Sequence, residues 1–185
     1  MLVRRATVED IPSVQSLIAR SVRELSIGFY TTAQIEAALA AVFGVDTQLI
    51  VDGTYYVVES PTGLAAAGGW SFRRTLYGGD QMKGDIDPRL DASTEPARIR
   101  AFFVHPEWTR RGLARSIFDE CRDAALAAGF LSFELMATLP GVPLYSALGF
   151  SVLERTSIVL GSGVELPLVR MTRRIEGSSA RESRL

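Results

Sequence analysis

Two spacings of apolar residues divide this chain into helical and extended stretches. Near the N-terminus, apolar residues recur every three to four positions at Ile11, Val14, Ile18 and Val22, which predicts a helix after a short first strand at 3–6. A second stretch with helical spacing begins near Thr32. The first quarter of the chain is therefore predicted to be mostly helical.

The middle of the chain has the composition of strands. The segments "TYYVVES" and "LAAAGGWSF" are rich in aromatic and apolar residues and are separated by the turn "PTG". Two glycines inside the second strand indicate a bulge or the close approach of another chain or ligand. Residues 73–96 show little periodicity and are predicted to form a long loop, which in a compact domain is usually functional or mobile.

The rest of the chain alternates strands and helices. The expected order is a strand at "ARIRAFFV", a helix after Gly112, a strand at "LSFELM", a short helix at 143–148 and a strand hairpin turning at 161–163. This order predicts a mixed α/β (α+β) sheet in a single domain, 1–175. Residues 176–185 are expected to be a flexible tail.

Composition narrows the class of protein. The chain has 185 residues, enough for one domain with a real core, and its formal net charge of -1 attracts neither nucleic acid nor a membrane surface. Neither partner is therefore expected. A single cysteine, Cys121, and the lack of a signal peptide or a long apolar run favour a cytoplasmic protein.

A basic turn joins the strand at 97–104 to the following helix. It reads Arg110-Arg111-Gly112-Leu113-Ala114, and Arg115 follows. The first amides of a helix are unpaired and lie at its positive end, so they bind phosphate oxygens readily, and a glycine lets a ligand approach the backbone. The pattern is neither a Walker A loop nor G-x-G-x-x-G. A solvated basic turn without a ligand is the alternative interpretation.

Two motifs, in order and at a suitable separation, resemble those of the GNAT superfamily of acyl-CoA-dependent N-acyltransferases. The first is Val104-His105-Pro106 followed by Thr109-Arg110-Arg111-Gly112-Leu113-Ala114, and the second contains Thr138, Gly141, Leu144-Tyr145 and Gly149-Phe150. The resemblance covers about residues 3–174. Thr109 stands where the family usually has Gln or Arg, Thr138 where it has Asn, and Gly141 where it has Ala.

This resemblance implies a mostly antiparallel central sheet flanked by helices, with strands that splay at the cofactor site. It implies acetyl-CoA as cosubstrate, with the pantetheine arm between 102–104 and 131–136 and the pyrophosphate on the amides of 110–115. The cofactor-binding residues implied are Phe102, Phe103, Val104, Thr109, Arg110, Arg111, Gly112, Leu113, Ala114, Arg115, Thr138 and Tyr145.

The resemblance also makes Tyr145 the candidate general acid, since a phenol can protonate the departing thiolate. An aromatic residue that packs on the cofactor is the alternative. His105 is the only histidine, but it occupies a variable position of the family motif. Other bases by residue type are Asp80, Asp85, Glu95 and Glu134, or water relays the proton. Cys121 is expected in the helix core, and no metal site is expected.

Aromatic residues near the predicted thioester end suggest an acceptor pocket. Tyr30, Trp70, Phe72 and Tyr77 are the candidates, although scattered aromatics are more often core residues. For Arg73 and Arg74 the sequence allows two interpretations. They contact an acidic substrate or the cofactor's 3′-phosphate, or they belong to a solvated loop. The acids of the 73–96 loop either attract a cationic amine or lie in a segment that only connects strands.

The expected function is N-acetylation of a small-molecule or peptide primary amine by direct attack on acetyl-CoA. The alternative is a catalytically weak GNAT-fold module that binds acyl-CoA as a sensor or interaction surface. The oligomeric state stays open, and a homodimer is compatible with either function.

Overall fold

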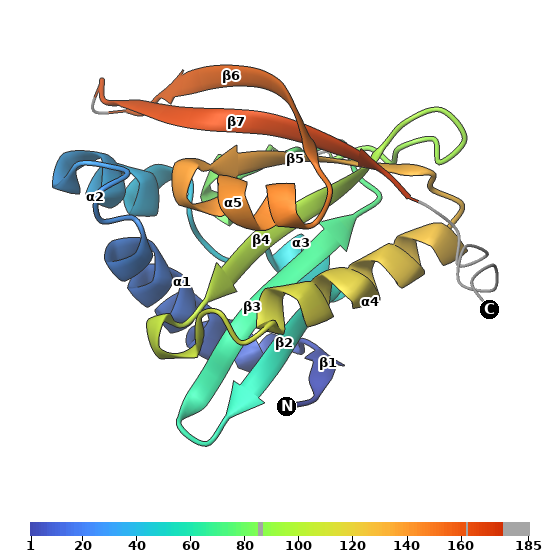
Figure 1. The fold of residues 1–185 in the computed structure, drawn as a ribbon, viewed down its shortest axis with the longest axis horizontal. Coiled ribbons are helices and arrows are strands. Elements are labelled where there is room, and N and C mark those ends of the chain that lie inside the picture. The colour runs from blue at the N-terminus through green and yellow to red at the C-terminus, as the bar shows by residue number, and fades with distance from the viewer. Residues whose placement is uncertain (85–86, 162, 176–185) are drawn as a thin grey trace.

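A single seven-stranded sheet organises the chain in the computed structural model, which describes residues 1–84, 87–161 and 163–175. The strand order is β1-β2-β3-β4-β5-β7-β6 (Figure 1). All neighbours are antiparallel except β4 and β5, as the prediction of a mixed, mostly antiparallel sheet required. The strands are β1 (Val3–Arg5), β2 (Tyr55–Ser60), β3 (Gly63–Ser71), β4 (Ala97–Val104), β5 (Ser132–Thr138), β6 (Ser151–Val159) and β7 (Glu165–Arg174).

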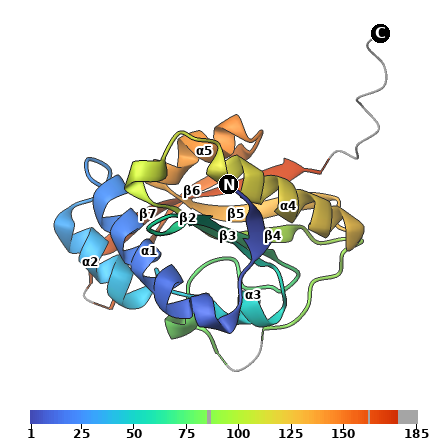
Figure 2. The same ribbon diagram turned by 90° about the horizontal axis from the view of Figure 1, so that it is seen from below.

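Helices cover both faces of this sheet (Figure 2). One face carries α1 (Ile11–Leu25), α2 (Thr32–Ala41) and α3 (Thr47–Val51), and the other carries α4 (Leu113–Ala127) and α5 (Val142–Ala147). Each face has its own hydrophobic cluster of buried side chains. Short 3-10 turns lie at η1 (Val8–Asp10), η2 (Asp80–Met82), η3 (Pro106–Trp108) and η4 (Leu139–Gly141). The sequence pattern missed α3, because five residues are too short to show a helical period.

The strands β4 and β5 are in register only at their first residues. Ala97 pairs with Phe133 and Arg98 with Glu134, and no pairing between the two strands follows. Beyond this point β4 continues along β3, and β5 continues along β7 as far as Thr138. The two strands therefore separate toward their carboxyl ends, which is the predicted splay.

The two glycines within β3 lie where β4 bulges. Between the pairs Ala67–Phe103 and Gly69–Arg100, β4 holds one more residue than β3, and Ala101 there has a φ of 53°. A Cβ atom on Gly68 would lie 2.7 Å from the Phe102 ring. Gly68 thus leaves the space that the Phe102 ring occupies. The group that comes close is a side chain of the neighbouring strand, where the prediction named another chain or a ligand, and the bulge lies in β4.

Residues 73–96 are only partly the irregular loop that their sequence predicts. The segment contains η2, and the Arg73 backbone bridges to Arg89. The Gly79 amide donates to the Val42 carbonyl at 2.9 Å, which fastens the segment to the connection between α2 and α3. Asp85 and the predicted tail, 176–185, lie outside the described residues.

Candidate active site

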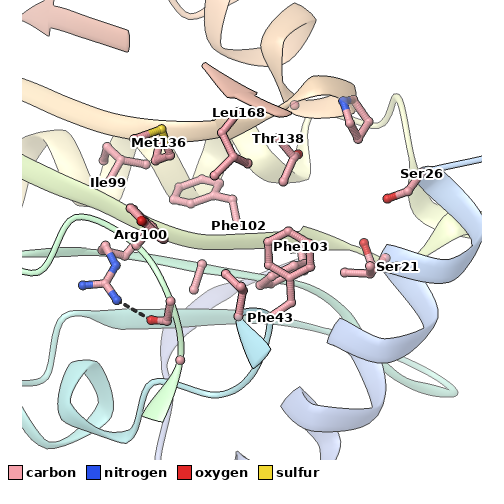
Figure 3. Close-up of a pocket in the computed structure, with 18 of the residues that line it drawn as sticks. Ser21, Ser26, Phe43, Ile99, Arg100, Phe102, Phe103, Met136, Thr138 and Leu168 are labelled. Carbon is pink, nitrogen blue, oxygen red and sulfur yellow. Dashed lines mark hydrogen bonds between the residues drawn. The ribbon is translucent and has the colours of Figure 1, made fainter. Parts of the chain in front are cut away.

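A cavity of about 200 Å³ crosses the sheet where β4 and β5 separate (Figure 3). Phe102 and Tyr145 line it and belong to the hydrophobic cluster under α4, whereas Phe103 and Met136 line it and belong to the cluster under α1. The cavity is therefore a passage between the two faces. Its walls come from α1, the α2–α3 connection, residues 76–79, β4, β5, β7, η4 and α5.

Tyr145 lines the passage from α5. Its ring meets Phe102 and Phe150 edge to face, with centroid distances of 6.3 and 5.8 Å. Its hydroxyl makes no hydrogen bond to any residue that the structure describes, and burial raises the pKa of this phenol above its ordinary value. A proton donor is therefore held protonated at neutral pH and is not used by the protein itself. Thr138, at the end of β5, lines the same cavity.

The basic turn has the geometry of an anion site. Gly112 caps α4 in the left-handed region, with a φ of 79°, and Arg110 before it has a φ of 61°. Because the Ser116 amide makes the first hydrogen bond, to the Gly112 carbonyl at 3.0 Å, the amides of 113–115 lack intrahelical partners. A Cβ atom on Gly112 would meet nothing within 4 Å, so the space above these amides is open.

Three side chains of the turn contact other parts of the protein and do not fill the space above the amides. The Thr109 hydroxyl donates to the Pro106 carbonyl at 3.0 Å, so it fastens the turn. The Arg111 guanidinium lies over the Trp108 ring at 4.4 Å, and Arg115 donates to a carbonyl at the end of α5. The replacement of the usual Gln or Arg by Thr109 therefore leaves the backbone donors intact.

One of the four aromatic acceptor candidates, Tyr77, lines the cavity. Tyr30, Trp70 and Phe72 do not line it. The Tyr30 hydroxyl donates to the Pro167 carbonyl at 2.6 Å and so ties the α1–α2 connection to β7. Trp70 packs edge to face on Phe72 in the cluster under α4. They are core residues, which is the usual place of scattered aromatics.

A buried ionic cluster adjoins the cavity. Arg100 lines the cavity with 3% of its surface exposed, and its Nη2 donates to Asp46 Oδ2 at 2.8 Å. The same guanidinium also donates to the carbonyls of Thr75 and Gly78. Lys83 binds the other carboxylate oxygen of Asp46. Burial lowers the pKa of Arg100, yet a guanidinium stays charged in proteins, so two cations share one carboxylate.

Sequence reasoning missed this cluster, because Asp46 and Arg100 lie 54 positions apart. The available signal was the pair of arginines, Arg98 and Arg100, in the otherwise apolar strand "ARIRAFFV", since a buried arginine needs a carboxylate partner.

Replacing Asp46 with asparagine is expected to destabilise the fold by about 3–5 kcal/mol, because Arg100 would stay buried without a carboxylate. Urea unfolding gives the free energy of unfolding of each variant. Lys83→Met is the control, since it leaves Arg100 paired and should cost much less. Equal losses in the two variants would contradict the role assigned to Asp46.

None of the base candidates that the structure describes lines the cavity. His105 Nδ1 accepts from the Glu107 amide at 3.3 Å, and the histidine lines a different hollow, against α1 and 62–64. Glu134 is held by Arg170, which donates to it at 2.9 Å. Cys121 is fully buried in the core under α4, as predicted, and burial raises the pKa of its thiol.

Charged residues of 73–96 are engaged within the protein. Arg73 pairs with Asp52 at 2.7 Å, and Arg74 lies 3.6 Å from Glu95. The Asp80 carboxylate accepts from the Thr47 amide at 3.0 Å. This segment does reach the cavity, but through Leu76, Tyr77 and two glycines instead of its acids. The described lining residues include no aspartate, glutamate or histidine.

Comparison with known proteins places this geometry in a family. The model of the acetyltransferase (GNAT) domain matches residues 76–172, about half of the chain. Comparison with the curated proteins gave no match. Among the described residues, none of the helices has the length and apolar character needed to cross a membrane.

Solved structures share the fold. A GCN5-related N-acetyltransferase from Rhodopseudomonas palustris is 16% identical with a TM-score of 0.68, and 94% of each chain is covered. PaiA N-acetyltransferase from Thermoplasma acidophilum, solved with coenzyme A, is 14% identical with a TM-score of 0.62, covering 94% of this chain and 98% of that one. YncA from Salmonella typhimurium, a putative acetyltransferase solved with acetyl-CoA, is 16% identical with a TM-score of 0.61, covering 99% and 98%.

The domain match spans the loop that reaches the cavity, the basic turn, the splayed strands and Tyr145. The chain therefore belongs to the GNAT acetyltransferase family.

Proposed function

We propose that this protein transfers an acetyl group from acetyl-CoA to a primary amine by direct attack. The observation that carries the proposal is the passage through the sheet at the splay of β4 and β5. A passage of this kind lets a cosubstrate held on the α4 face present its reactive end to an acceptor on the α1 face. A cytoplasmic location, where acetyl-CoA and free amines are both at hand, is part of the proposal.

The residues at hand fit acetyl-CoA. The free amides of 113–115 and the open space at Gly112 suit a pyrophosphate, and Arg110 adds exposed positive charge. Residues 102–104 of β4 have no partner strand on the side of β5, so their backbone is available to an extended pantetheine arm. Bound acetyl-CoA would supply the thioester.

The chain's own groups would assist the exchange of the C–S bond for a C–N bond. As the amine nitrogen attacks the thioester carbon, the sulfur leaves and needs a proton. Tyr145 lines the passage and is held protonated, so it is the donor. The proton that the amine loses passes to water, since the described lining residues offer no carboxylate or imidazole to take it.

That lack of a base also favours a second candidate, an acyl-CoA-binding module that works as a sensor or interaction surface. The two functions differ in turnover. Purified protein mixed with acetyl-CoA and a panel of amines is expected to release CoA thiol, measured with a thiol-reactive dye, and to form the N-acetyl product, measured by mass spectrometry. Tight acetyl-CoA binding with no thiol released for any amine would leave the sensor function and exclude the transferase.

A further inference from the structure

The half of the cavity on the α1 face is almost entirely apolar. Side chains from α1, the α2–α3 connection, the 73–96 segment and three strands form its wall, which brings together elements far apart in the sequence (Figure 3). The apolar and aromatic residues of this wall are Val22, Leu25, Val42, Phe43, Leu76, Tyr77, Phe103, Met136 and Leu168. Such a wall selects a ligand with an apolar body.

The direct ion pairs beside this wall contain more cations than carboxylates. Among the described lining residues Arg100 is the one charged side chain, and its cluster holds two cations for one carboxylate, since Asp46 is shared with Lys83. A second cluster on the same face repeats this ratio, with Glu134 shared by Arg98 and Arg170. An ammonium group entering here would be desolvated and repelled, with no free carboxylate to pair with.

Two serines that are more than nine-tenths buried open into the same space. Ser21 and Ser26 are 5% and 4% exposed, both line the cavity, and neither hydroxyl bonds to any residue that the structure describes. Their residues are almost fully buried, yet both oxygen atoms remain accessible and unpaired within the described part of the chain, so they can bond to a ligand in the cavity. A serine hydroxyl can accept a hydrogen bond from an amine N–H and donate to water or to a second polar atom.

We propose that the acceptor is a weakly basic primary amine on an apolar body, which binds uncharged with its nitrogen at Ser21 and Ser26. The class comprises arylamines and the α-amino groups of apolar amino-acid amides, and it leaves out alkylamines such as the lysine side chain. This deepens the proposed function, on which it rests, by naming its substrate class. In the transfer the C–N bond forms, the C–S bond breaks, and the amine proton leaves through the hydroxyls to water.

The first test compares three amines with similar apolar bodies: p-toluidine, L-phenylalaninamide and phenethylamine. An α-amino group with a pKa near 8 is about one-tenth uncharged at pH 7, whereas an alkylamine resembling lysine, near 10.4, is uncharged at less than about one part in a thousand. Calorimetry with CoA-saturated protein should give phenethylamine an affinity lower than that of L-phenylalaninamide by on the order of 10²-fold. Equal or tighter binding of phenethylamine, or no binding of p-toluidine, would overturn the proposal.

The pH dependence supplies an independent readout. From pH 7 to 9, the affinity for phenethylamine should rise about tenfold per unit, as its neutral form accumulates, while that for p-toluidine stays flat. The ionisable groups around the bound amine are Arg100 with Asp46 and Lys83, then Asp87 and Tyr55 beside Arg100, and the phenols of Tyr77 and Tyr145. A single apparent pKa shared by all three amines would reveal a titrating protein group and contradict the proposal.

The second test removes the hydroxyls. Ser21→Ala and Ser26→Ala should each weaken p-toluidine binding about threefold to tenfold and leave CoA binding unchanged. Ser16→Ala is the matched control, since this exposed α1 hydroxyl bonds to the Pro12 carbonyl outside the cavity. Unchanged p-toluidine affinity in both cavity variants would refute the assignment of the hydroxyls.

Measuring amine binding and CoA-thiol release separately distinguishes the proposed acceptor class from the proposed acetyl transfer. Amines that bind in the expected order without any release of CoA thiol would disprove the transfer and leave the acceptor class intact. Thiol release that is fastest with phenethylamine would disprove the acceptor class and leave the transfer intact.

Discussion

Replacing Gly112 with glutamate is expected to abolish the stabilisation that acetyl-CoA gives the wild-type protein. At a concentration about one hundred times its Kd, a ligand adds about 2.7 kcal/mol, which raises the Tm of a domain of this size by about 5–10 °C. The new side chain would fill the open space above the amides of 113–115, and its carboxylate would repel a pyrophosphate there. Differential scanning fluorimetry with and without acetyl-CoA measures the shift.

Gly129→Glu is the matched control for this variant. Gly129 follows the other end of α4 and has a φ of 91°, so glutamate brings similar backbone strain and the same charge, far from the turn. Its Cβ atom would lie 3.7 Å from Ala92, an ordinary contact. We expect a lower Tm but a full acetyl-CoA shift. A shift that survives in Gly112→Glu would show that the pyrophosphate is bound elsewhere.

Removing the Tyr145 hydroxyl is expected to lower kcat by about 10²–10⁴-fold, the usual contribution of a general acid. Tyr145→Phe keeps the ring that meets Phe102 and Phe150, and the hydroxyl bonds to none of the described residues, so the fold should be preserved. Steady-state kinetics and the acetyl-CoA Kd, measured on the same preparation, separate proton donation from packing.

The raised pKa of Tyr145 also predicts how kcat depends on pH. An acid loses activity as the pH rises through its pKa, and burial moves this pKa above the ordinary value near 10. Tyr145 should therefore cause no fall in kcat up to about pH 9. Wild-type kcat with weakened acetyl-CoA binding in Tyr145→Phe would identify the tyrosine as a packing residue.

The elements that the sequence predicted best were those whose signal is local. The helical spacing from Ile11 to Val22 and the alternating apolar residues of the hairpins depend only on neighbouring residues. The glycines of β3 indicated an irregularity at this point of the sheet, and the structure has the extra residue in the neighbouring strand β4. The turn at Gly112 could be predicted for the same reason, because a helix end and its caps are set within a few positions. These local features, in order, were enough to indicate the family.

The acceptor half of the site could not be predicted, because it is assembled from segments that meet only in the folded chain. Ser21 and Ser26 look like ordinary helix-surface serines in the sequence, and only the fold shows that they are buried beside Phe103 and Tyr77. The acids of 73–96 suggested attraction of a cation, yet the segment turns apolar residues and glycines toward the cavity. Long-range placement, which no local pattern encodes, decided both outcomes.

The short register between β4 and β5 has a consequence for how the molecule holds together. Because two residue pairs join them, the sheet consists of two half-sheets, β1–β4 and β5–β7–β6, coupled at one end by backbone and by the Arg98–Glu134 contact. Apart from these contacts, the two half-sheets are coupled during folding by the packed side chains of the core. A pantetheine arm bound between β4 and β5 would connect the two half-sheets while acetyl-CoA is bound. We therefore expect the cosubstrate to couple the unfolding of the two half-sheets more tightly.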